Sequence, residues 1–259
     1  MREVPGSSPG IPTNSMIFPN FKTERELYAK GYHFVAGCDE VGMAPLAGPV
    51  VAAACILDSS SIGVKRGKSK WYYRVRDSKT TDSKERIKLL PEIMSHCLAF
   101  GIGSASPQQI DVLNIHNAAL LAMRAAFEDL VRKLEELLPL ACETQGIKNK
   151  AQEIKNKIFL ILDGRFTLKD LQSENFDLFQ KAIIDADAKI LSVSAASIIA
   201  KEHRDAILRQ MDRELPGYGF ARHKGYATRE HRDAILTHGI TSHHRKSFLK
   251  NFDLQFKLN

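Results

Sequence analysis

The sequence predicts an α/β protein built on a mixed β-sheet. Short apolar runs of strand length alternate along the chain with longer stretches in which apolar residues recur every three or four positions, as on one face of a helix. Two of the strand-like runs are separated only by a short loop with Gly and Pro, which is typical of a hairpin. With 259 residues, 44% of them hydrophobic, the chain is long enough to bury a full core.

The first half of the chain is expected to begin with a disordered tail and to contain three strands. Residues 1–20 are rich in Pro, Gly, Ser and Asn, a composition that buries too little apolar surface to fold. Asp82 is expected to cap a helix, with Glu85 three residues on, and Pro91 to kink or split that helix. The expected elements are a short helix at 24–30, strands at 32–38 and 48–57, a basic loop at 59–76, a helix at 82–97 and a strand at 98–104.

The second half contains the clearest helix, between Asn117 and Leu138. Ser106 is expected to cap the helix before it, with Pro107 in the first turn. The apolar stripe of the long helix, which we assign to the core, consists of Ala119, Met123, Phe127, Leu130, Leu134 and Leu137. The other expected elements are a polar insertion at 139–157, strands at 158–162 and 182–185, a helix at 188–213, a Gly-rich loop at 216–226 and a helix at 228–237.

The chain is basic, with a formal charge of +7 and a pI of about 9.2. Seven Lys or Arg stand against one acid at 59–79, where Trp71, Tyr72 and Tyr73 interrupt the run. Seven more stand against two acids at 222–250, together with five of the nine histidines. Such clusters suit a polyanion such as nucleic acid, although each alone is equally consistent with a solvated face or a flexible loop.

Membrane insertion and secretion are not expected. No run approaches the roughly 20 apolar residues of a membrane span, and the N-terminus has no apolar segment of a secretory signal. The four cysteines form no CxxC pair, which argues against a cysteine zinc site; they are Cys38, Cys55, Cys97 and Cys142. The first three lie inside apolar runs, where buried free thiols are common, and this fits a reducing cytoplasm.

Two of the predicted strands end in acidic residues. Asp39 and Glu40 follow the run FVAGC, Asp163 follows IFLIL, and Asp187 stands just before a predicted helix. Any one of them alone is better explained as a turn or capping residue. Together, carboxylates at strand ends can converge on one edge of a sheet, where oxygen ligands suit Mg²⁺ or Mn²⁺. Two such ions about 4 Å apart can hold both oxygens of a phosphodiester displacement.

Neighbouring residues of a regular strand point to opposite faces. Asp39 and Glu40 are therefore expected to share a site only if the strand breaks there. Gly42 and Pro45 are residues that allow such a break.

Five segments, in order, resemble the motifs of the type 2 ribonucleases H, or ribonuclease HII. The fourth is the most specific, and together they cover most of residues 33–250. The segments are GCDEVGMAPLAGPVVAAACIL at 37–57, DSK at 77–79, ILDG at 161–164, DAKILSVSAASIIAKEHRD at 187–205, and GYGFARHKGYATREH with HHRKSF within 217–248.

The resemblance implies a ribonuclease-H-like fold, a mixed central β-sheet flanked by helices with a helical C-terminal extension. It implies endonucleolytic cleavage of RNA in RNA–DNA hybrids and at single ribonucleotides embedded in duplex DNA. On this basis we expect a catalytic domain at 21–215 and a C-terminal helical substrate-binding segment at 216–259. We also expect a cytoplasmic monomer that uses two Mg²⁺ or Mn²⁺ ions.

The resemblance also implies roles for single residues. The metal-binding catalytic acids are Asp39, Glu40, Asp163 and Asp187. Residues that match substrate-contacting or site-supporting positions are Gly42, Met43, Ala44, Lys79, Ser197, Lys201, Arg204 and Tyr226. Tyr226 matches the tyrosine that lies under the sugar next to the scissile phosphate. Arg245 and Ser247 match positions that either support the fold or contact phosphate.

The sequence departs from the family pattern after Asp39 and Glu40. The family has Gly-Arg-Gly or Gly-Lys-Gly, which grips the 2′-hydroxyl and the adjoining phosphates largely through backbone groups; here it reads Gly42-Met43-Ala44. Methionine keeps the backbone N–H but loses a phosphate contact worth about 1–3 kcal/mol. Ala44 adds a Cβ where the ligand approaches the backbone closely. These changes put cleavage at a single ribonucleotide in more doubt than hybrid cleavage. The interval from Asp163 to Asp187 is also longer than usual for the family.

The mechanism implied by the family is a two-metal hydrolysis. Asp39 bridges both ions, a metal-bound water attacks phosphorus in line, and the products are a 5′-phosphate and a 3′-hydroxyl. Tyr226 stacks on the deoxyribose on the 3′ side, and Lys65 to Arg76 add phosphate contacts that weaken with salt. Four C-terminal histidines match no metal-binding spacing and are expected to lie at the surface or near phosphates. They are His223, His231, His243 and His244.

Three alternatives remain open from the sequence. The first is a nuclease active on hybrids but without single-ribonucleotide specificity. The second is another nuclease of the same fold, although such enzymes lack the SAASIIAK and GYAT segments. The third is a duplex-binding protein without catalysis, against which the presence of all four acids argues.

Overall fold

A computed structural model describes residues 18–61, 71–75, 82–144 and 155–250. Its centre is a five-stranded sheet with strand order β3-β2-β1-β4-β5. The strands are β1 (Phe34–Val41), β2 (Val50–Leu57), β3 (Cys97–Ala105), β4 (Asn156–Asp163) and β5 (Phe176–Ile183). Strand β1 pairs with β2 antiparallel and with β4 parallel, so the sheet is mixed, as the sequence predicts.

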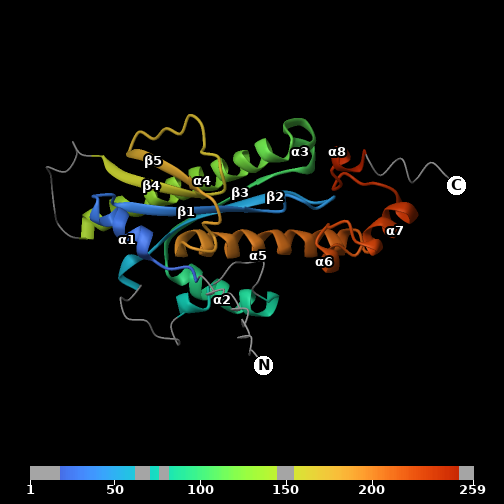
Figure 1. Ribbon diagram of the computed structural model, residues 1–259, viewed down its shortest axis with the longest axis horizontal. Helices are drawn as coiled ribbons and strands as arrows, with labels where there is room; N and C mark the ends of the chain where they lie inside the picture. The colour runs from blue at the N-terminus through green and yellow to red at the C-terminus, as the bar shows by residue number, and fades with distance from the viewer. Residues whose placement is uncertain (1–17, 62–70, 76–81, 145–154, 251–259) are drawn as a thin grey trace, which may run out of the picture.

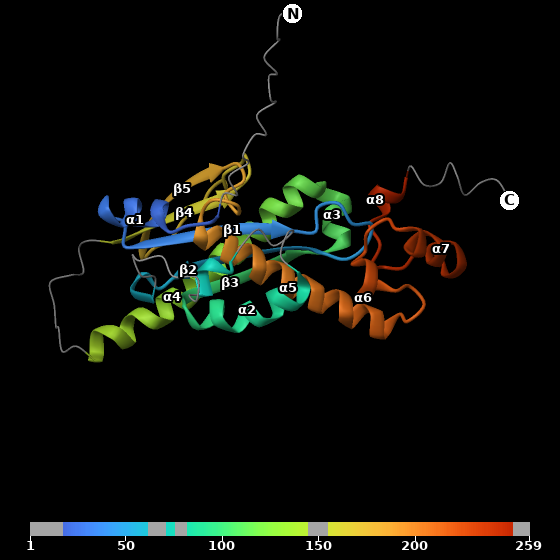
Figure 2. The same ribbon diagram turned by 60° about the horizontal axis from the view of Figure 1, so that its bottom comes forward.

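Helices cover both faces of this sheet (Figure 1). Helix α4 (Ile115–Thr144) lies along one face, and α5 (Leu191–Glu214) lies along the other, with α2 (Ser83–Ser95) beside it (Figure 2). The remaining helices are α1 (Lys22–Ala29), α3 (Pro107–Leu113), α6 (Phe220–His223), α7 (Arg229–His238) and α8 (Lys246–Leu249). Every residue of β2 is buried, which explains why its sequence is a continuous apolar run and not an alternating one.

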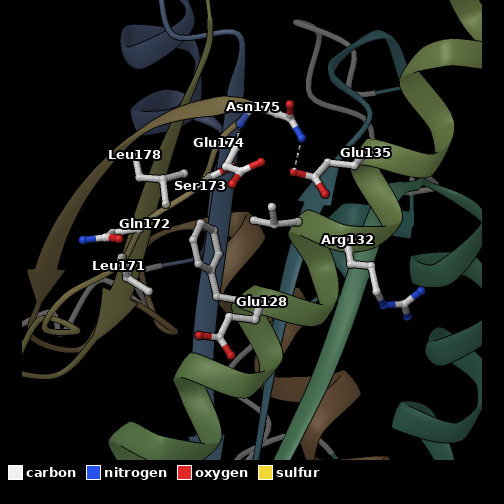
Figure 3. A pocket seen from close by; sticks show the side chains of 11 residues that line it. Glu128, Arg132, Glu135, Leu171, Gln172, Ser173, Glu174, Asn175 and Leu178 are labelled. Atoms are coloured by element: carbon white, nitrogen blue, oxygen red, sulfur yellow. Dashed lines mark hydrogen bonds between the residues drawn. The ribbon is translucent and has the colours of Figure 1, made fainter.

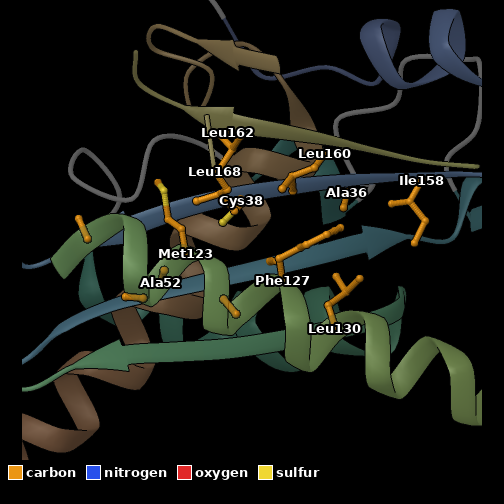
Figure 4. Close-up of a cluster of buried hydrophobic side chains, with 14 of the residues drawn as sticks. Ala36, Cys38, Ala52, Met123, Phe127, Leu130, Ile158, Leu160, Leu162 and Leu168 are labelled. Carbon is orange, nitrogen blue, oxygen red and sulfur yellow. The ribbon is translucent and has the colours of Figure 1, made fainter. Parts of the chain in front are cut away.

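The two faces of the sheet enclose separate hydrophobic clusters. On the α4 face, Ala36 and Cys38 of β1 pack with Met123 and Phe127 of α4 (Figure 4). On the α5 face, Val35 of β1 packs with residues at the start of α5. The alternation along β1 therefore directs odd-numbered residues toward α5 and even-numbered residues toward α4.

Two glycines allow the helices to approach the sheet closely. A Cβ on Gly101 of β3 would lie 2.1 Å from the carbonyl oxygen of Ala126 in α4. A Cβ on Gly37 of β1 would lie 2.3 Å from the backbone of Ser192 in α5. Any larger residue at Gly37 would push the start of α5 away from the end of β1.

The capping predictions for two helices have different outcomes. Ser106 caps α3 in a capping box with Gln109, and Pro107 is in the first turn, as predicted. Asp82 is at the N-cap position of α2 but makes no side-chain capping bond. Pro91 does not split α2, which runs without interruption to Ser95.

Two other predictions were wrong. The expected polar insertion does not begin at residue 139, because α4 continues through Pro139 to Thr144. The short strand expected at 182–185 is only the end of β5, which begins at Phe176. Polar residues within β5 (Asp177, Gln180 and Lys181) concealed it, since this edge strand is only partly buried.

The C-terminal elements share a core with the end of α5. Tyr218, Phe220 and Ile235 pack with Leu208 of α5 and with Leu46 from the loop between β1 and β2. The Gly-rich segment at 216–226 contains the short helix α6, which the sequence did not predict. Among the described residues, no helix is long and apolar enough to cross a membrane.

Candidate active site

The parallel pairing of β1 with β4 brings two of the predicted acids together. The last paired residues are Cys38 and Leu162, so Asp39 and Asp163 each follow one residue later on neighbouring strands. Cys38 and Leu162 both pack on the α4 face, and the alternation therefore directs Asp39 and Asp163 toward α5. This places both carboxylates at the carboxyl ends of two adjacent parallel strands.

Strand β1 does not break at Asp39 and Glu40, contrary to the expectation from the sequence. Asp39 pairs with Ala53 and Glu40 with Ala52, and the pairing with β2 continues to Val41. The chain bends only at Gly42, which has a φ of +96°. Glu40 is nevertheless close enough for its charge to raise the pKa of Asp39.

Asp187 reaches the site from the turn before α5. The backbone N–H of Ala186 donates to Asp163 Oδ1 at 2.7 Å, which fixes this turn against the end of β4. Asp187 itself is buried, with 4% of its surface exposed. Ser197, in the helix α5 that follows this turn, forms a side-chain hydrogen bond with Asp39.

The four acids form one electrostatic cluster around Asp39. Burial raises the pKa of Asp39 well above its ordinary value, and the charges of Glu40, Asp163 and Asp187 raise it further, against the hydrogen bond from Ser197. A cation bound here would compensate these charges and oppose the rise of the pKa.

The donor set of this cluster fits hard divalent cations. Among the described residues no three His, Cys, Asp or Glu side chains already form a metal cage. Mg²⁺ does not require one, because it keeps several waters and takes only one or two carboxylates with substrate phosphate oxygens. The buried Asp39 and the three carboxylates around it provide such ligands, and a cation would relieve their repulsion.

The segment Gly42-Met43-Ala44 follows directly after β1. A Cβ on Gly42 would lie 2.3 Å from Nε of Arg204, so this position requires glycine for both space and backbone angle. Met43 is half-buried and packs against the α4-side core, while Ala44 is exposed. Lys79 lies outside the described residues.

Lys201 and Arg204 of α5 differ in what they contact. Lys201 forms an ion pair with Asp205. Arg86 of α2 forms a second ion pair with Asp205, at 3.5 Å. Arg204 is buried and donates to the carbonyl oxygens of three residues. They are Pro49 at 2.9 Å, Ala47 at 3.1 Å and Lys224 at 3.1 Å. Its guanidinium is thus engaged within the protein and supports the site.

Tyr226 lies between α6 and α7 with 45% of its surface exposed. The backbone of Tyr226 is held on both sides. The N–H of Tyr226 donates to the carbonyl of His223 at 2.9 Å, and Nδ1 of His231 lies 2.9 Å from the carbonyl oxygen of Tyr226. The ring is therefore accessible to a ligand while its backbone is fixed.

Three of the four C-terminal histidines are buried, which corrects the expectation of surface histidines. His223 stacks on His231 with ring centroids 4.3 Å apart, and Nε2 of His231 lies 3.2 Å from Nε2 of His244. Burial lowers the pKa of both His231 and His244 to about 4, so these rings are neutral at pH 7.

Arg245 and Ser247 have structural contacts. Arg245 is fully buried, and its guanidinium donates to the carbonyls of Gly42, Met43 and Gly48 at 2.7, 3.1 and 3.0 Å. Ser247 donates to Asp111 through its backbone N–H. The sequence could not distinguish these roles from phosphate contacts, because Arg245 and Gly42 are 203 positions apart and no spacing relates them.

A hollow of about 330 Å³ lies elsewhere, between α4 and the segment leading into β5. Figure 3 shows Glu128, Arg132 and Glu135 of α4 on one side and Asn175 on the other, with Asn175 donating to Glu135 at 2.9 Å. It is at the beginning of β4 and β5 on the α4 face, since Leu178 pairs with Ile158. None of the four acids lines it.

Comparisons with known proteins converge on one family and one fold. The family model described as Ribonuclease HII matches residues 36–251. The chain is 38% identical over 221 residues to a Ribonuclease HII of Vibrio vulnificus, covering 85% of this chain and 88% of that protein. It is 39% identical over 229 residues to a Ribonuclease HII of Acetivibrio thermocellus, covering 88% of this chain and 75% of that protein.

Two solved structures share the fold at lower identity. The crystal structure of ribonuclease H2 from Pyrococcus horikoshii OT3 aligns with a TM-score of 0.54 at 21% identity, covering 87% of this chain and all of that one. The RNase HII in a PCNA complex from Archaeoglobus fulgidus aligns with a TM-score of 0.50 at 21% identity, covering 82% of this chain and 93% of that one. The mixed sheet with its flanking and C-terminal helices is therefore a ribonuclease-H-like fold.

Proposed function

This chain belongs to the ribonuclease HII family, and from that premise we propose that Asp39, Glu40, Asp163 and Asp187 are its catalytic, metal-binding carboxylates. The activity is that of a type 2 ribonuclease H: endonucleolytic cleavage of RNA in RNA–DNA hybrids and at ribonucleotides embedded in duplex DNA. The family is one of divalent-metal-dependent nucleases. Two Mg²⁺ or Mn²⁺ ions are the cofactors we propose.

The observation that supports this assignment best is the convergence of acids from separate elements at the buried Asp39. The register of β1 and β4 places Asp163 beside it, Glu40 follows it in β1, and the hydrogen bond from Ala186 to Asp163 holds the turn that carries the buried Asp187. A folded chain gains no stability from placing three acids around a buried carboxyl group, so the arrangement indicates a ligand of opposite charge.

In the proposed mechanism the four carboxylates hold the ions, with Ser197 orienting Asp39 through its hydrogen bond. When bound, the ions supply Lewis-acid stabilisation of the attacking water and of the leaving 3′-oxygen. Asp163 keeps the turn that carries Asp187 in place by accepting from Ala186. Cleavage leaves a 5′-phosphate and a 3′-hydroxyl.

Recognition of the ribonucleotide is proposed to involve the segment Gly42-Met43-Ala44 and the exposed ring of Tyr226. The 2′-hydroxyl is the group by which a protein distinguishes RNA from DNA. Tyr226 would stack on the deoxyribose on the 3′ side of the scissile phosphate. Lys79 and Lys201 are proposed to lie near phosphates, with Ser197 and Arg204 supporting the site.

Two labelled duplexes test these assignments in the presence of Mg²⁺ or Mn²⁺. One has a single ribonucleotide in a DNA strand, and the other has a continuous RNA strand on DNA. The variant is Asp39→Asn, and the matched control is Asp185→Asn, which changes an acid whose side chain is 73% exposed on the turn before α5. We expect both duplexes to be cut by the wild type and by Asp185→Asn, and neither by Asp39→Asn.

The other outcomes are distinct. Cutting of the hybrid alone would show that Met43 and Ala44 have removed recognition of a single ribonucleotide. If neither duplex is cut although both are bound, the catalytic assignment is wrong and the chain is a duplex-binding protein.

A further inference from the structure

Two buried arginines lie behind the segment that follows β1. Arg204 of α5 and Arg245, just before α8, are the two largest fully buried side chains, with 1% and 0% of their surface exposed. Each donates to three backbone carbonyls, and five of these six carbonyls belong to residues 42–49. We refer to residues 42–49 as the β1–β2 loop.

Neither guanidinium has an ion-pair partner among the described residues; the carbonyl oxygens are their partners. Burial and the neighbouring Arg204 lower the pKa of Arg245 to about 9, at which it is still charged at neutral pH. Burying two like charges side by side is costly unless their donors are all used. Holding the β1–β2 loop with two buried guanidinium groups therefore costs free energy, which indicates that the conformation of this loop has a function.

The hydrogen bonds of Arg245 determine which way two peptide groups face. All described peptide bonds are trans, so the N–H of each peptide group points away from its C=O. Because Arg245 holds the carbonyls of Gly42 and Met43, the N–H groups of Met43 and Ala44 point away from it. No hydrogen bond within the described residues uses either N–H. Two adjacent backbone donors that point away from Arg245 and have no partner among the described residues suit a hydroxyl or phosphate oxygen.

The backbone of residues 243–245 is also hydrogen-bonded to the β1–β2 loop. Arg245 N–H donates to Leu46 at 2.8 Å, Gly48 N–H donates to His243 at 2.8 Å, and Ala47 pairs with His244 in an isolated β-bridge. Leu46 N–H donates to Gly225 at 2.8 Å. The loop and the residue before Tyr226 are therefore parts of one hydrogen-bonded unit.

We propose that Arg245, supported by Arg204, is the positioning residue of the ribonucleotide-recognition loop: it directs the N–H groups of Met43 and Ala44 toward the substrate, so that recognition does not depend on a cationic side chain at position 43. This inference rests on the proposed role of residues 42–44. It explains how methionine can occupy that position, because the side chain turns to the core while the backbone is held from behind.

The test compares Arg245→Ala and Arg245→Lys with the wild type on the two duplexes described above. The single-ribonucleotide duplex offers one productive register, whereas the hybrid offers many. A misplaced loop should therefore lower kcat/KM on the single-ribonucleotide duplex at least tenfold and on the hybrid no more than about threefold. For Arg245→Ala, millimolar guanidinium should restore at least part of this loss, while the same concentration of NaCl should not.

Leu134→Ala is the control for a general loss of stability. Leu134 is buried at 1% exposure in α4, in the core on that face of the sheet, and is not one of the residues assigned to the loop or to the acids. All proteins are assayed well below their unfolding midpoints, and Arg245→Lys, which keeps the charge, serves if Arg245→Ala does not fold. We expect Leu134→Ala to leave the ratio of the two kcat/KM values unchanged.

The inference is overturned if the Arg245 variants lower kcat/KM equally on both duplexes. It is also overturned if guanidinium restores no more of the activity of Arg245→Ala than NaCl does. This failure can be distinguished from failure of the proposed function. If only the inference fails, the wild type still cuts both duplexes; if the proposed function fails, the wild type does not cut them.

Discussion

Asp39 is a single residue whose surroundings in the site lower the stability of the folded protein. Its carboxyl group is buried next to three other acids, and these surroundings raise its pKa. An acid with a raised pKa in the folded state contributes stability below its unfolded pKa and loses that contribution as the pH rises from there through its folded pKa. Without a cation, Asp39 therefore destabilises the fold at neutral pH.

Asp39→Asn is accordingly expected to stabilise the protein while abolishing cleavage. Asparagine can keep the contact of Oδ1 with the N–H of Glu40, at 2.8 Å in the wild type, and removes the charge. In EDTA at pH 7.5 the free energy of unfolding should rise by about 1–2 kcal/mol. Denaturant unfolding measures it, and the gain should disappear as the pH falls below the unfolded pKa of Asp39, 3.8, where the group is protonated in both states. An unchanged stability at pH 7.5 would show that the four acids do not repel one another in the fold.

At the scale of elements, the buried histidines connect α6, α7 and the turn before Arg245. His223 stacks on His231, and His231 contacts His244. The rings of His231 and His244 are neutral at pH 7 in the folded state, because burial lowers their pKa from 6.5 to about 4. The unfolded chain takes up protons on these histidines already below about pH 6.5.

Stability should therefore fall as the pH decreases from 6.5 to 4, by on the order of 3 kcal/mol for each histidine. Denaturant unfolding across this range measures the slope. His244→Gln should flatten the slope, while the control His116→Gln, at an exposed position of α4, should not.

A buried glutamate acts in the opposite direction and needs its own control. Burial raises the pKa of Glu24 to about 7, so its stabilising contribution is lost as the pH rises from 4.5 to 7. The comparison of histidine variants is best made in a Glu24→Gln background. An equal slope in the parent and in His244→Gln would contradict the histidine assignment.

At the scale of the molecule, the C-terminal elements and the central sheet share one core. The boundary expected at residue 215 crosses the cluster in which Phe220 packs with Leu208 and Leu46. The division into a catalytic domain at 21–215 and a substrate-binding segment at 216–259 stays a prediction for function. For stability, the shared cluster indicates one cooperative unit.

Phe220→Ala tests this cooperativity. Phe220 is fully buried, and its truncation is expected to cost about 3–5 kcal/mol. Trp71, the only tryptophan, packs with α2 and β2 on the central sheet and reports the unfolding of that region by fluorescence. The midpoint seen by Trp71 should decrease with Phe220→Ala and stay unchanged with Leu236→Ala, whose side chain is 61% exposed on α7. An unchanged midpoint with Phe220→Ala would mean that the C-terminal elements unfold separately.

The basic clusters of the sequence have different outcomes at this scale. Most of the segment at 59–79 lies outside the described residues, but Trp71 and Tyr72 are buried against α2 and α5. They belong to the core and are not exposed to a duplex. At 222–250, Arg245 and three histidines are inside the protein, so the charge of this segment is not all available to phosphates.

The sequence by itself determined the fold class, the order of most elements, the family and the candidate acids. These depend on local information: apolar periodicity, strand-end acids and contiguous motifs such as SAASIIAK. Strand β5 escaped prediction because pairing at a sheet edge overrides local propensity, and the extension of α4 escaped it because Pro139 predicts a helix end.

Only the tertiary structure decided how the site is held. The register of β1 with β4 brings Asp39 beside Asp163, and β1 remains regular through Glu40 because its pairing with β2 continues. Arg245 was a residue of undecided role until its three carbonyl partners were seen. The physical reason is that a buried guanidinium must satisfy its donors wherever carbonyls converge, and that convergence joins residues 203 positions apart.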